Sequence, residues 1–301
     1  MDSVLILMST YNGERYLKEQ INSLLNQRDV DIQILVRDDG STDKTTDILN
    51  DYQKKGLLEW YTGDNLRPAK SFMDLVYHAP DYEYYAFCDQ DDYWEEDKLN
   101  IALEWLKKQT QDVPALYYGR PRLVDQNLSK IDNPETTLHR MLTFREAIIN
   151  SNATGCTMVF NAALMKKVQE KRPNYIAMHD GWFHKVCLIS GGKVYFDEDV
   201  HILYRQHGKN VIGIDGSMLG KLKKHIRSLK NKECIRSRTI SSLLDCYGDQ
   251  MNREDYELSE MVAYYRHDFK KKLKLLTDKR IRTSYKKRNL LFKIAILFNA
   301  Y

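Results

Sequence analysis

Short apolar runs alternate with amphipathic stretches along the first ninety residues. Between the runs, apolar side chains recur at helical spacing, and Asn12-Gly13 and Asp38-Asp39-Gly40 supply turn residues. Four runs have the length of a strand: residues 4–8, 32–36, 57–61 and 84–87. Repeated strand–helix units predict an α/β fold in which a mostly parallel sheet is doubly wound with helices.

The alternation weakens after residue 92. A helix is predicted over residues 98–108, and strands are predicted over residues 115–124, 158–160 and 194–204. Beyond Gly216 the chain has no proline and few turn signals, which predicts helices to the end. We therefore expect an α/β domain over residues 1–215 and a helical, basic segment over residues 216–301.

The composition is that of a folded globular protein. Hydrophobic residues make up 43% and charged residues 29% of the 301 positions, which argues against a disordered or fibrous chain. No apolar run approaches the ~20 residues that span a bilayer, and no secretory signal is predicted. The 5 cysteines are odd in number and scattered, which favours reduced thiols and a cytoplasmic location over disulfides or a zinc site.

Positive charge gathers in the C-terminal segment, which holds 21 basic and 9 acidic residues from Gly216 onward. Basic clusters at residues 270–274 and 286–288 precede the apolar run 290–298, which as a helix spans only ~13 Å. That run could lie on an anionic membrane surface at the inner face of the cell membrane, or dock on the protein itself or in a homodimer interface. No nucleic-acid partner is expected, because no nucleic-acid-binding signature is present.

Polar side chains cluster directly after the first, second and fourth predicted strands. These clusters are Ser9-Thr10-Tyr11-Asn12, Asp38-Asp39 and Asp89-Gln90-Asp91-Asp92. Because ligands of parallel sheets bind beyond the carboxyl ends of the strands, we expect the three clusters to meet in one cleft.

Asp89 and Asp91 place two carboxylates one residue apart at a strand end. Repulsion between them favours a divalent partner, and Mg²⁺ or Mn²⁺ held by few carboxylates implies a phosphate-bearing ligand. The alternative is an acidic surface turn. Aromatic residues flank the acids on both sides, which is unusual for a solvated turn.

Taken together, these motifs resemble those of inverting family 2 glycosyltransferases of the GT-A fold. The residues that carry the resemblance are Ser9-Thr10-Tyr11-Asn12-Gly13, Asp38-Asp39-Gly40-Ser41-Thr42-Asp43 and Asp89-Gln90-Asp91-Asp92-Tyr93-Trp94. It extends through residues 152–155, 179–182 and 204–211 and so covers roughly the first 215 residues. The pattern is most similar to the rhamnosyltransferase branch, which builds bacterial surface polysaccharides from dTDP-rhamnose on lipid-linked acceptors.

The resemblance implies a nucleotide-binding half at about residues 1–110 and an acceptor half at about 111–215. It assigns the nucleoside of a dTDP- or UDP-sugar donor to Thr10, Tyr11, Asp38 and Asp39. The chemistry agrees, since a carboxylate can accept the imide N–H of a pyrimidine and a tyrosine can cover its flat face. Alternatively, Tyr11 belongs to the core, and Asp38 or Asp39 caps the following helix.

The resemblance also implies a metal site. Asp91 would ligate Mn²⁺ or Mg²⁺, Asp89 would contact the ribose or the metal, and His207 would complete the site. A structural role for His207 near Arg205 stays open. Arg205 itself could support the charge of the diphosphate.

Arg205 has a second interpretation from the sequence. A structural ion pair with Asp197 or Asp199 is as consistent with its position as a contact to the donor.

Asp180 matches the position of the catalytic base in the family. In inverting transfer, one carboxylate takes the proton of the acceptor hydroxyl as it attacks the anomeric carbon. At the start of a predicted helix, Asp180 could instead be a cap. Gly155 would let the backbone approach the donor sugar, and Trp182 could stack on an acceptor ring or pack in the core.

The predicted function is that of an inverting, metal-dependent glycosyltransferase acting on a glycan or polyprenyl-linked acceptor. A UDP-hexose-dependent transferase of the same fold is the alternative. A nucleotidyltransferase is disfavoured because its glycine-rich, arginine-bearing first loop is missing, and a non-catalytic nucleic-acid-binding protein is disfavoured by the acidic cluster. The sugar and the acceptor depend on loop geometry that no spacing rule predicts.

Overall fold

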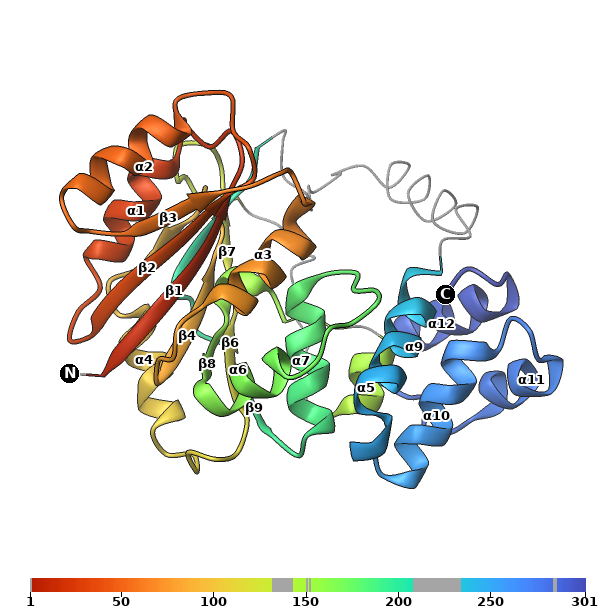
Figure 1. Ribbon diagram of the computed structural model, residues 1–301. Coiled ribbons are helices and arrows are strands. Elements are labelled where there is room, and N and C mark those ends of the chain that lie inside the picture. The colour runs from red at the N-terminus through yellow and green to blue at the C-terminus, as the bar shows by residue number, and fades with distance from the viewer. Residues whose placement is uncertain (1, 132–142, 150, 152, 208–233, 284–285) are drawn as a thin grey trace.

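A seven-stranded mixed sheet forms the centre of the N-terminal part of the protein (Figure 1). The computed structural model describes residues 2–131, 143–149, 151, 153–207, 234–283 and 286–301. The strand order is β3-β2-β1-β4-β8-β6-β9, in which β8 alone runs antiparallel to both neighbours. The strands are β1 Ser3–Thr10, β2 Asp31–Asp38, β3 Glu59–Thr62, β4 Tyr84–Cys88, β6 Ala115–Gly119, β8 Val159–Asn161 and β9 Lys193–Asp197. The predicted mostly parallel sheet is confirmed.

Helices cover both faces of this sheet, as predicted. One face carries α1 Leu17–Leu25, α2 Thr45–Lys54 and α4 Lys98–Leu106, and the other carries α3 Arg67–His78, α6 Ala162–Gln169 and α7 His179–Ile189. Successive side chains of a strand point to opposite faces, so Val4 and Ile6 enter the first core while Leu5 and Leu7 enter the second. Burial on both faces explains the continuous apolar run of β1.

Two predicted strands each divide between two sheets. A second, three-stranded sheet has the order β5-β10-β7, with β5 Tyr93–Trp94, β10 Ile202–Arg205 and β7 Arg122–Val124. The single strand predicted over residues 115–124 is wrong, because the chain leaves the main sheet at Arg120-Pro121 and continues as β7. The strand predicted over residues 194–204 likewise divides into β9 and β10. The small sheet brings the end of β10 beside the acidic loop that precedes β5.

The described C-terminal segment is helical, as predicted. It comprises α9 Ile235–Tyr247, η2 Gly248–Gln250, α10 Arg253–Tyr264, α11 Phe269–Thr277 and α12 Lys286–Leu297. These helices lie to one side of the sheet, next to α7 and to α5 Phe144–Ile149 (Figure 1). Ile240, Leu243 and Ile296 belong to the same buried core as Leu5 and Leu7, so the segment packs on the α/β domain. The boundary predicted near residue 216 lies outside the described residues.

All five cysteines are buried and free of disulfides, which confirms the prediction of reduced thiols. Within the described residues, no helix combines the length and the apolar character needed to cross a bilayer.

Candidate active site

The three predicted polar clusters meet at the carboxyl ends of β1, β2 and β4. Gln90, from the loop after β4, accepts hydrogen bonds from Thr10 Oγ1 at 2.6 Å and from the Tyr11 backbone N–H at 2.8 Å. Its amide in turn donates to the Tyr11 carbonyl at 3.2 Å, and the Asp39 N–H donates to the Thr10 carbonyl at 2.8 Å. Gln90 was not singled out from the sequence, although its place between Asp89 and Asp91 set it at this edge.

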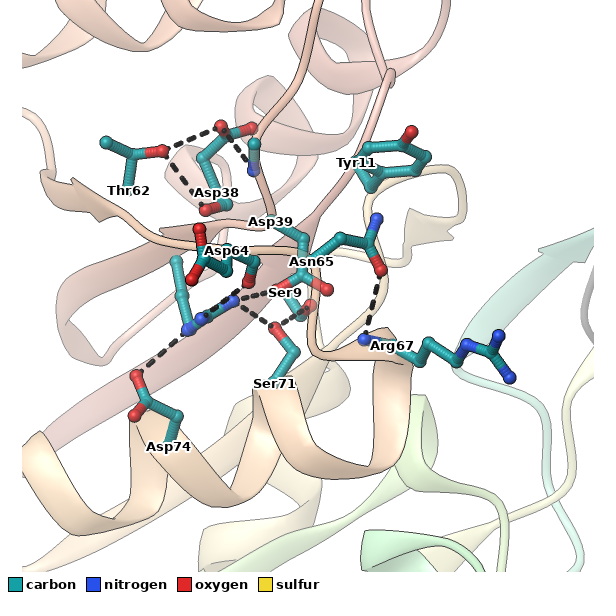
Figure 2. Close-up of polar contacts among 12 residues, drawn as sticks. Ser9, Tyr11, Asp38, Asp39, Thr62, Asp64, Asn65, Arg67, Ser71 and Asp74 are labelled. Carbon is teal, nitrogen blue, oxygen red and sulfur yellow. Dashed lines mark hydrogen bonds and ion pairs between the residues drawn. The ribbon is translucent and has the colours of Figure 1, made fainter.

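Asp38 stabilises the turn after β2 through hydrogen bonds to its side chain (Figure 2). Its buried carboxylate accepts hydrogen bonds from the N–H groups of Gly40 and Ser41 at 3.1 and 2.9 Å. The hydroxyl of Thr62 on β3 donates to the same carboxylate at 3.2 Å. Asp38 does not cap α2, whose N-cap is Lys44. Its contacts shape the loop in which a nucleoside would lie.

Asp39 is buried and forms an ion pair with Arg37 at the end of β2. Arg37 also pairs with Asp74 of α3 at 2.9 Å and donates to the Asp64 carbonyl at 3.1 Å. Asp39 therefore is not a helix cap. The sequence reasoning missed Arg37, because the arginine lies inside a strand pattern and its partners are distant in the chain.

Tyr11 is 46% exposed, so the core alternative is wrong for this residue. Figure 2 shows its ring standing clear of the strands, on the same side as Asn65 and Arg67 at the start of α3. A ring in this position is free to cover one face of a planar base.

The acidic loop divides into two groups of side chains. Asp91 Oδ2 lies 2.8 Å from His207 Nε2, which follows β10, and the His207 ring stacks on Tyr16 at 5.2 Å. The second group consists of Asp89, Asp92 and Cys156. One carboxylate oxygen of each aspartate and the thiol sulfur of Cys156 lie within 4.8 Å of one another. His207 thus lies next to Asp91, as expected. Asp92 and Cys156, which were not expected at the site, lie next to Asp89.

The carboxylates of this loop destabilise one another's ionised form. Burial, followed by the charges of Asp91 and Asp180, raises the pKa of Asp89 to about 7. Burial also raises the pKa of Asp92 well above its ordinary value, with further contributions from Asp89 and Asp91. Beneath the loop, burial lowers the pKa of Lys98 to about 7. A bound divalent cation would stabilise the ionised carboxylates and so lower their pKa values.

The residues present fit Mn²⁺ or Mg²⁺. Asp91 Oδ2 and His207 Nε2, which are hydrogen-bonded to each other at 2.8 Å, are a carboxylate oxygen and an imidazole nitrogen, and both kinds of atom ligate such ions. The Cys156 thiol fits less well, because burial raises its pKa and sulfur is a soft ligand. Asp91 and His207 are the better ligand candidates, with Asp89 next to them.

Arg205 is buried and connects α1, the acidic loop and the loop after β7. Its guanidinium forms an ion pair with Glu19 of α1 and donates to the Asp91 carbonyl at 2.8 Å and to the Gln126 carbonyl at 2.6 Å. Its backbone N–H donates to Asp92 Oδ1 at 3.1 Å. The structural pairing expected with Asp197 or Asp199 is therefore wrong. These contacts position the acidic loop, so any support that Arg205 gives to a diphosphate is indirect.

Asp197 is engaged elsewhere. Its Oδ2 accepts a hydrogen bond from Tyr117 at 2.5 Å and lies 3.6 Å from His201 Nε2. This explains why Arg205, on the neighbouring sheet, has other partners.

Asp180 occupies the second position of α7. It lies near the acidic loop, since its charge contributes to the raised pKa of Asp89. Its Oδ1 accepts the Gly181 N–H at 2.5 Å, and burial raises its pKa. One turn further along, Lys185 Nζ donates to the Gly181 carbonyl at 3.1 Å, and its charge partly offsets that rise. Lys185 was missed because its burial depends on packing.

The structure bears on two further residues near α7. Trp182 is fully buried in the core, so it is not available to stack on an acceptor ring. Gly155 opens the 3₁₀ turn η1 Gly155–Thr157, where a Cβ atom would lie 2.6 Å from His179 Nε2. The His179 ring stacks on Phe72 with centroids 3.9 Å apart. Internal packing against His179 is thus the structural reason for a glycine at position 155.

The mixed, mostly parallel sheet with helices on both faces is similar to the fold of GT-A transferases. Residues 5–171, more than half of the chain, match the model of Glycosyl transferase family 2. The chain therefore belongs to glycosyltransferase family 2.

Curated relatives agree with this assignment. The chain is 30% identical over 239 residues to the dTDP-rhamnosyl transferase RfbG of Shigella flexneri, which covers 72% of this chain and 77% of that protein. It is 31% identical over 162 residues to the putative teichuronic acid biosynthesis glycosyltransferase TuaG of Bacillus subtilis, covering 52% and 60% respectively.

Solved structures share the fold. Staphylococcus aureus TarS 1-349 in complex with UDP-GlcNAc matches with a TM-score of 0.57 at 18% identity, covering 100% of this chain and 93% of that chain. The mannosyltransferase PcManGT from Pyrobaculum calidifontis, in complex with GDP-Man and Mn²⁺, matches with a TM-score of 0.58 at 15% identity, covering 99% and 85%.

Proposed function

We propose that the protein is an inverting, metal-dependent glycosyltransferase that moves rhamnose from dTDP-rhamnose to a glycan or polyprenyl-linked acceptor. Its role would be in bacterial surface polysaccharide synthesis, in the cytoplasm and at the inner face of the membrane. The observation that carries the proposal is the nearness of the Asp91–His207 pair and the Asp180 carboxylate to Asp89. The likeness to RfbG supports the choice of donor.

The loops after β1 and β2 would hold the nucleoside. The exposed Tyr11 ring can cover one face of thymine, and a carboxylate of the loop carrying Asp38 and Asp39 can accept its imide N–H. Thr10 contributes by fixing Gln90, which orients the acidic loop. The donor diphosphate would then extend from this loop toward Asp91 and His207.

Asp91 and His207 would hold the metal, and Asp89 would contact the metal or the ribose. A bound Mn²⁺ or Mg²⁺ would offset the negative charge that grows on the leaving diphosphate. The Mn²⁺ bound with GDP-Man in the neighbouring mannosyltransferase structure supports this cofactor.

Asp180 would act as the base. Its carboxylate accepts the proton of the acceptor hydroxyl while that oxygen bonds to the anomeric carbon and the bond to the dTDP oxygen breaks. The proton ends on Asp180 and the electron pair of the broken bond on dTDP. Because the hydroxyl oxygen attacks opposite the departing diphosphate, the anomeric configuration of the sugar inverts. Burial raises the pKa of Asp180, and the hydrogen bond from the Gly181 N–H and the charge of Lys185 offset part of that rise, which favours the ionised form that the base needs.

A UDP-sugar donor is the second candidate. The fold shared with TarS, which was solved with UDP-GlcNAc, favours it, because a uracil presents the same imide N–H as thymine.

A donor panel tests the proposal. Purified protein is offered dTDP-rhamnose, dTDP-glucose, UDP-GlcNAc or UDP-glucose with Mn²⁺, together with synthetic polyprenyl-diphosphate saccharides and soluble glycans. We expect transfer from dTDP-rhamnose, its loss in excess chelator, and its loss in Asp91→Ala. Preference for a UDP-sugar would favour the second candidate, and full activity with chelator or in Asp91→Ala would contradict the metal site.

A further inference from the structure

The five most exposed large apolar side chains of the described residues all lie on α11, on α12 or directly after it. Their exposed fractions are 50 to 72%, whereas that of Tyr11, the next in rank, is 46%. They are Phe269, Leu273, Leu290, Leu297 and Phe298, and they are called the C-terminal apolar face below. Single exposed apolar residues are common on protein surfaces, but a group of this kind marks an interaction site.

The two helices that carry the face pack against each other. On α12, Leu290 and Leu297 are seven residues apart and lie on one side, while Phe292 and Ile296 on the other side are buried. Lys272 of α11 donates to the Leu297 carbonyl at 2.9 Å, which fixes α11 against the end of α12. One side of the apolar run 290–298 thus docks on the protein, and the other side faces outward.

Basic side chains surround the C-terminal apolar face. Five exposed lysines lie on the same two helices: Lys270, Lys274, Lys286, Lys287 and Lys293. Residues 266–301 contain 12 basic and 2 acidic residues. Both acids already have partners, because Asp268 caps α11 and Asp278 pairs with Arg280. The surroundings of the face are therefore strongly positive.

We propose that the C-terminal apolar face binds the surface of a bilayer that contains anionic lipids. Apolar side chains would enter the region between headgroups and acyl chains, while the lysines contact lipid phosphates. A second copy of the chain is a poorer occupant, because it would place two strongly basic surfaces together. α12 has 12 residues and spans ~18 Å, so it would lie in the plane of the membrane.

The proposal rests on the proposed function only for the acceptor, because adsorption would bring the active site close to polyprenyl-linked saccharides. The membrane surface itself is argued from exposure and charge. Membrane binding and the proposed sugar transfer can therefore be disproved independently of each other.

The test is co-sedimentation of the full chain with vesicles. Vesicles of phosphatidylcholine alone are compared with vesicles of phosphatidylcholine and phosphatidylglycerol in equal amounts, at low and at high salt. We expect binding to the anionic vesicles, weakened by salt. The double variant Leu290→Ser/Leu297→Ser should bind at least about tenfold more weakly, because it loses apolar insertion. The double variant Lys286→Ala/Lys287→Ala should bind the anionic vesicles about tenfold more weakly at low salt.

Matched controls use exposed residues elsewhere. Leu57→Ser removes an exposed leucine between α2 and β3, and Lys54→Ala/Lys108→Ala removes two exposed lysines; both variants should bind vesicles like the wild type. Wild-type protein that ignores anionic vesicles at low salt would overturn the proposal, as would unchanged binding by Leu290→Ser/Leu297→Ser. A solution dimer that this variant converts to monomers would assign the face to a second copy instead. Vesicle binding without any sugar transfer would overturn the proposed function alone.

Discussion

His179 precedes Asp180 in the chain, and its environment gives it a structural role. The imidazole is packed between Phe72 and Phe87, and neither ring nitrogen has a hydrogen-bond partner among the described residues. Burial lowers the pKa of His179 from its ordinary 6.5 to about 3. The ring is therefore neutral in the folded protein at every pH above about 3, and it accounts for the glycine at position 155.

This burial predicts a pH-dependent stability. Below pH 6.5 an unfolded chain would protonate His179 whereas the folded chain would not, so unfolding takes up a proton and stability falls as the pH falls. Between pH 7 and pH 5 the wild type should lose about 2 kcal/mol through this group, at ~1.4 kcal/mol per pH unit below 6.5. Urea unfolding of the wild type and of His179→Gln at both pH values measures the difference. Equal losses in the two proteins would contradict the assignment.

Much of the candidate site follows from residue positions in the sequence. Thr10, Asp38 and Asp91 could be predicted to meet because each follows a strand of the same parallel sheet. The partners of Arg205 could not be predicted, since Glu19 lies 186 residues away and reaches the arginine only through packing of α1 against the small sheet. The burial of Trp182 is also a property of packing, because helical spacing alone does not say which face meets the core.

At the scale of elements, α12 divides into a side that stabilises the fold and a side that does not. Ile296 is fully buried in the core shared with the sheet, while its neighbour Leu297 is 53% exposed. The strands and helices of the first ninety residues were predictable because their apolar patterns are regular. The division of α12 was not, since an apolar run of nine residues contains no signal for which side is covered.

Alanine substitutions in α12 test this division. Ile296→Ala should lower the free energy of unfolding by about 2–5 kcal/mol, because it opens a cavity in the core. Leu297→Ala should change it by less than ~0.5 kcal/mol. Urea unfolding of both variants, with equal m-values, provides the measurement. Similar small effects for the two positions would show that α12 is not part of the core.

For the molecule as a whole, the polar clusters lie at the carboxyl edge of the sheet and the C-terminal helices complete the core next to α7. Asp180 lies on α7, which contacts both α3 and α9 and so joins the two parts of the protein. This arrangement couples the position of Asp180 to the packing of the C-terminal helices. The boundary expected near residue 216 could be proposed from composition, but a shared core could not, because contacts between distant segments leave no local pattern.

We propose above that Asp180 takes the proton of the acceptor hydroxyl during transfer from a nucleotide sugar. The most direct measurement is the rate of transfer from saturating dTDP-rhamnose, with the acceptor selected by the donor panel, for the wild type and Asp180→Asn. Asparagine keeps an oxygen that can accept the Gly181 N–H but loses the basic carboxylate. The account predicts unchanged donor binding and a rate at least about 10²-fold lower in Asp180→Asn. A variant that transfers sugar within about threefold of the wild-type rate would contradict it.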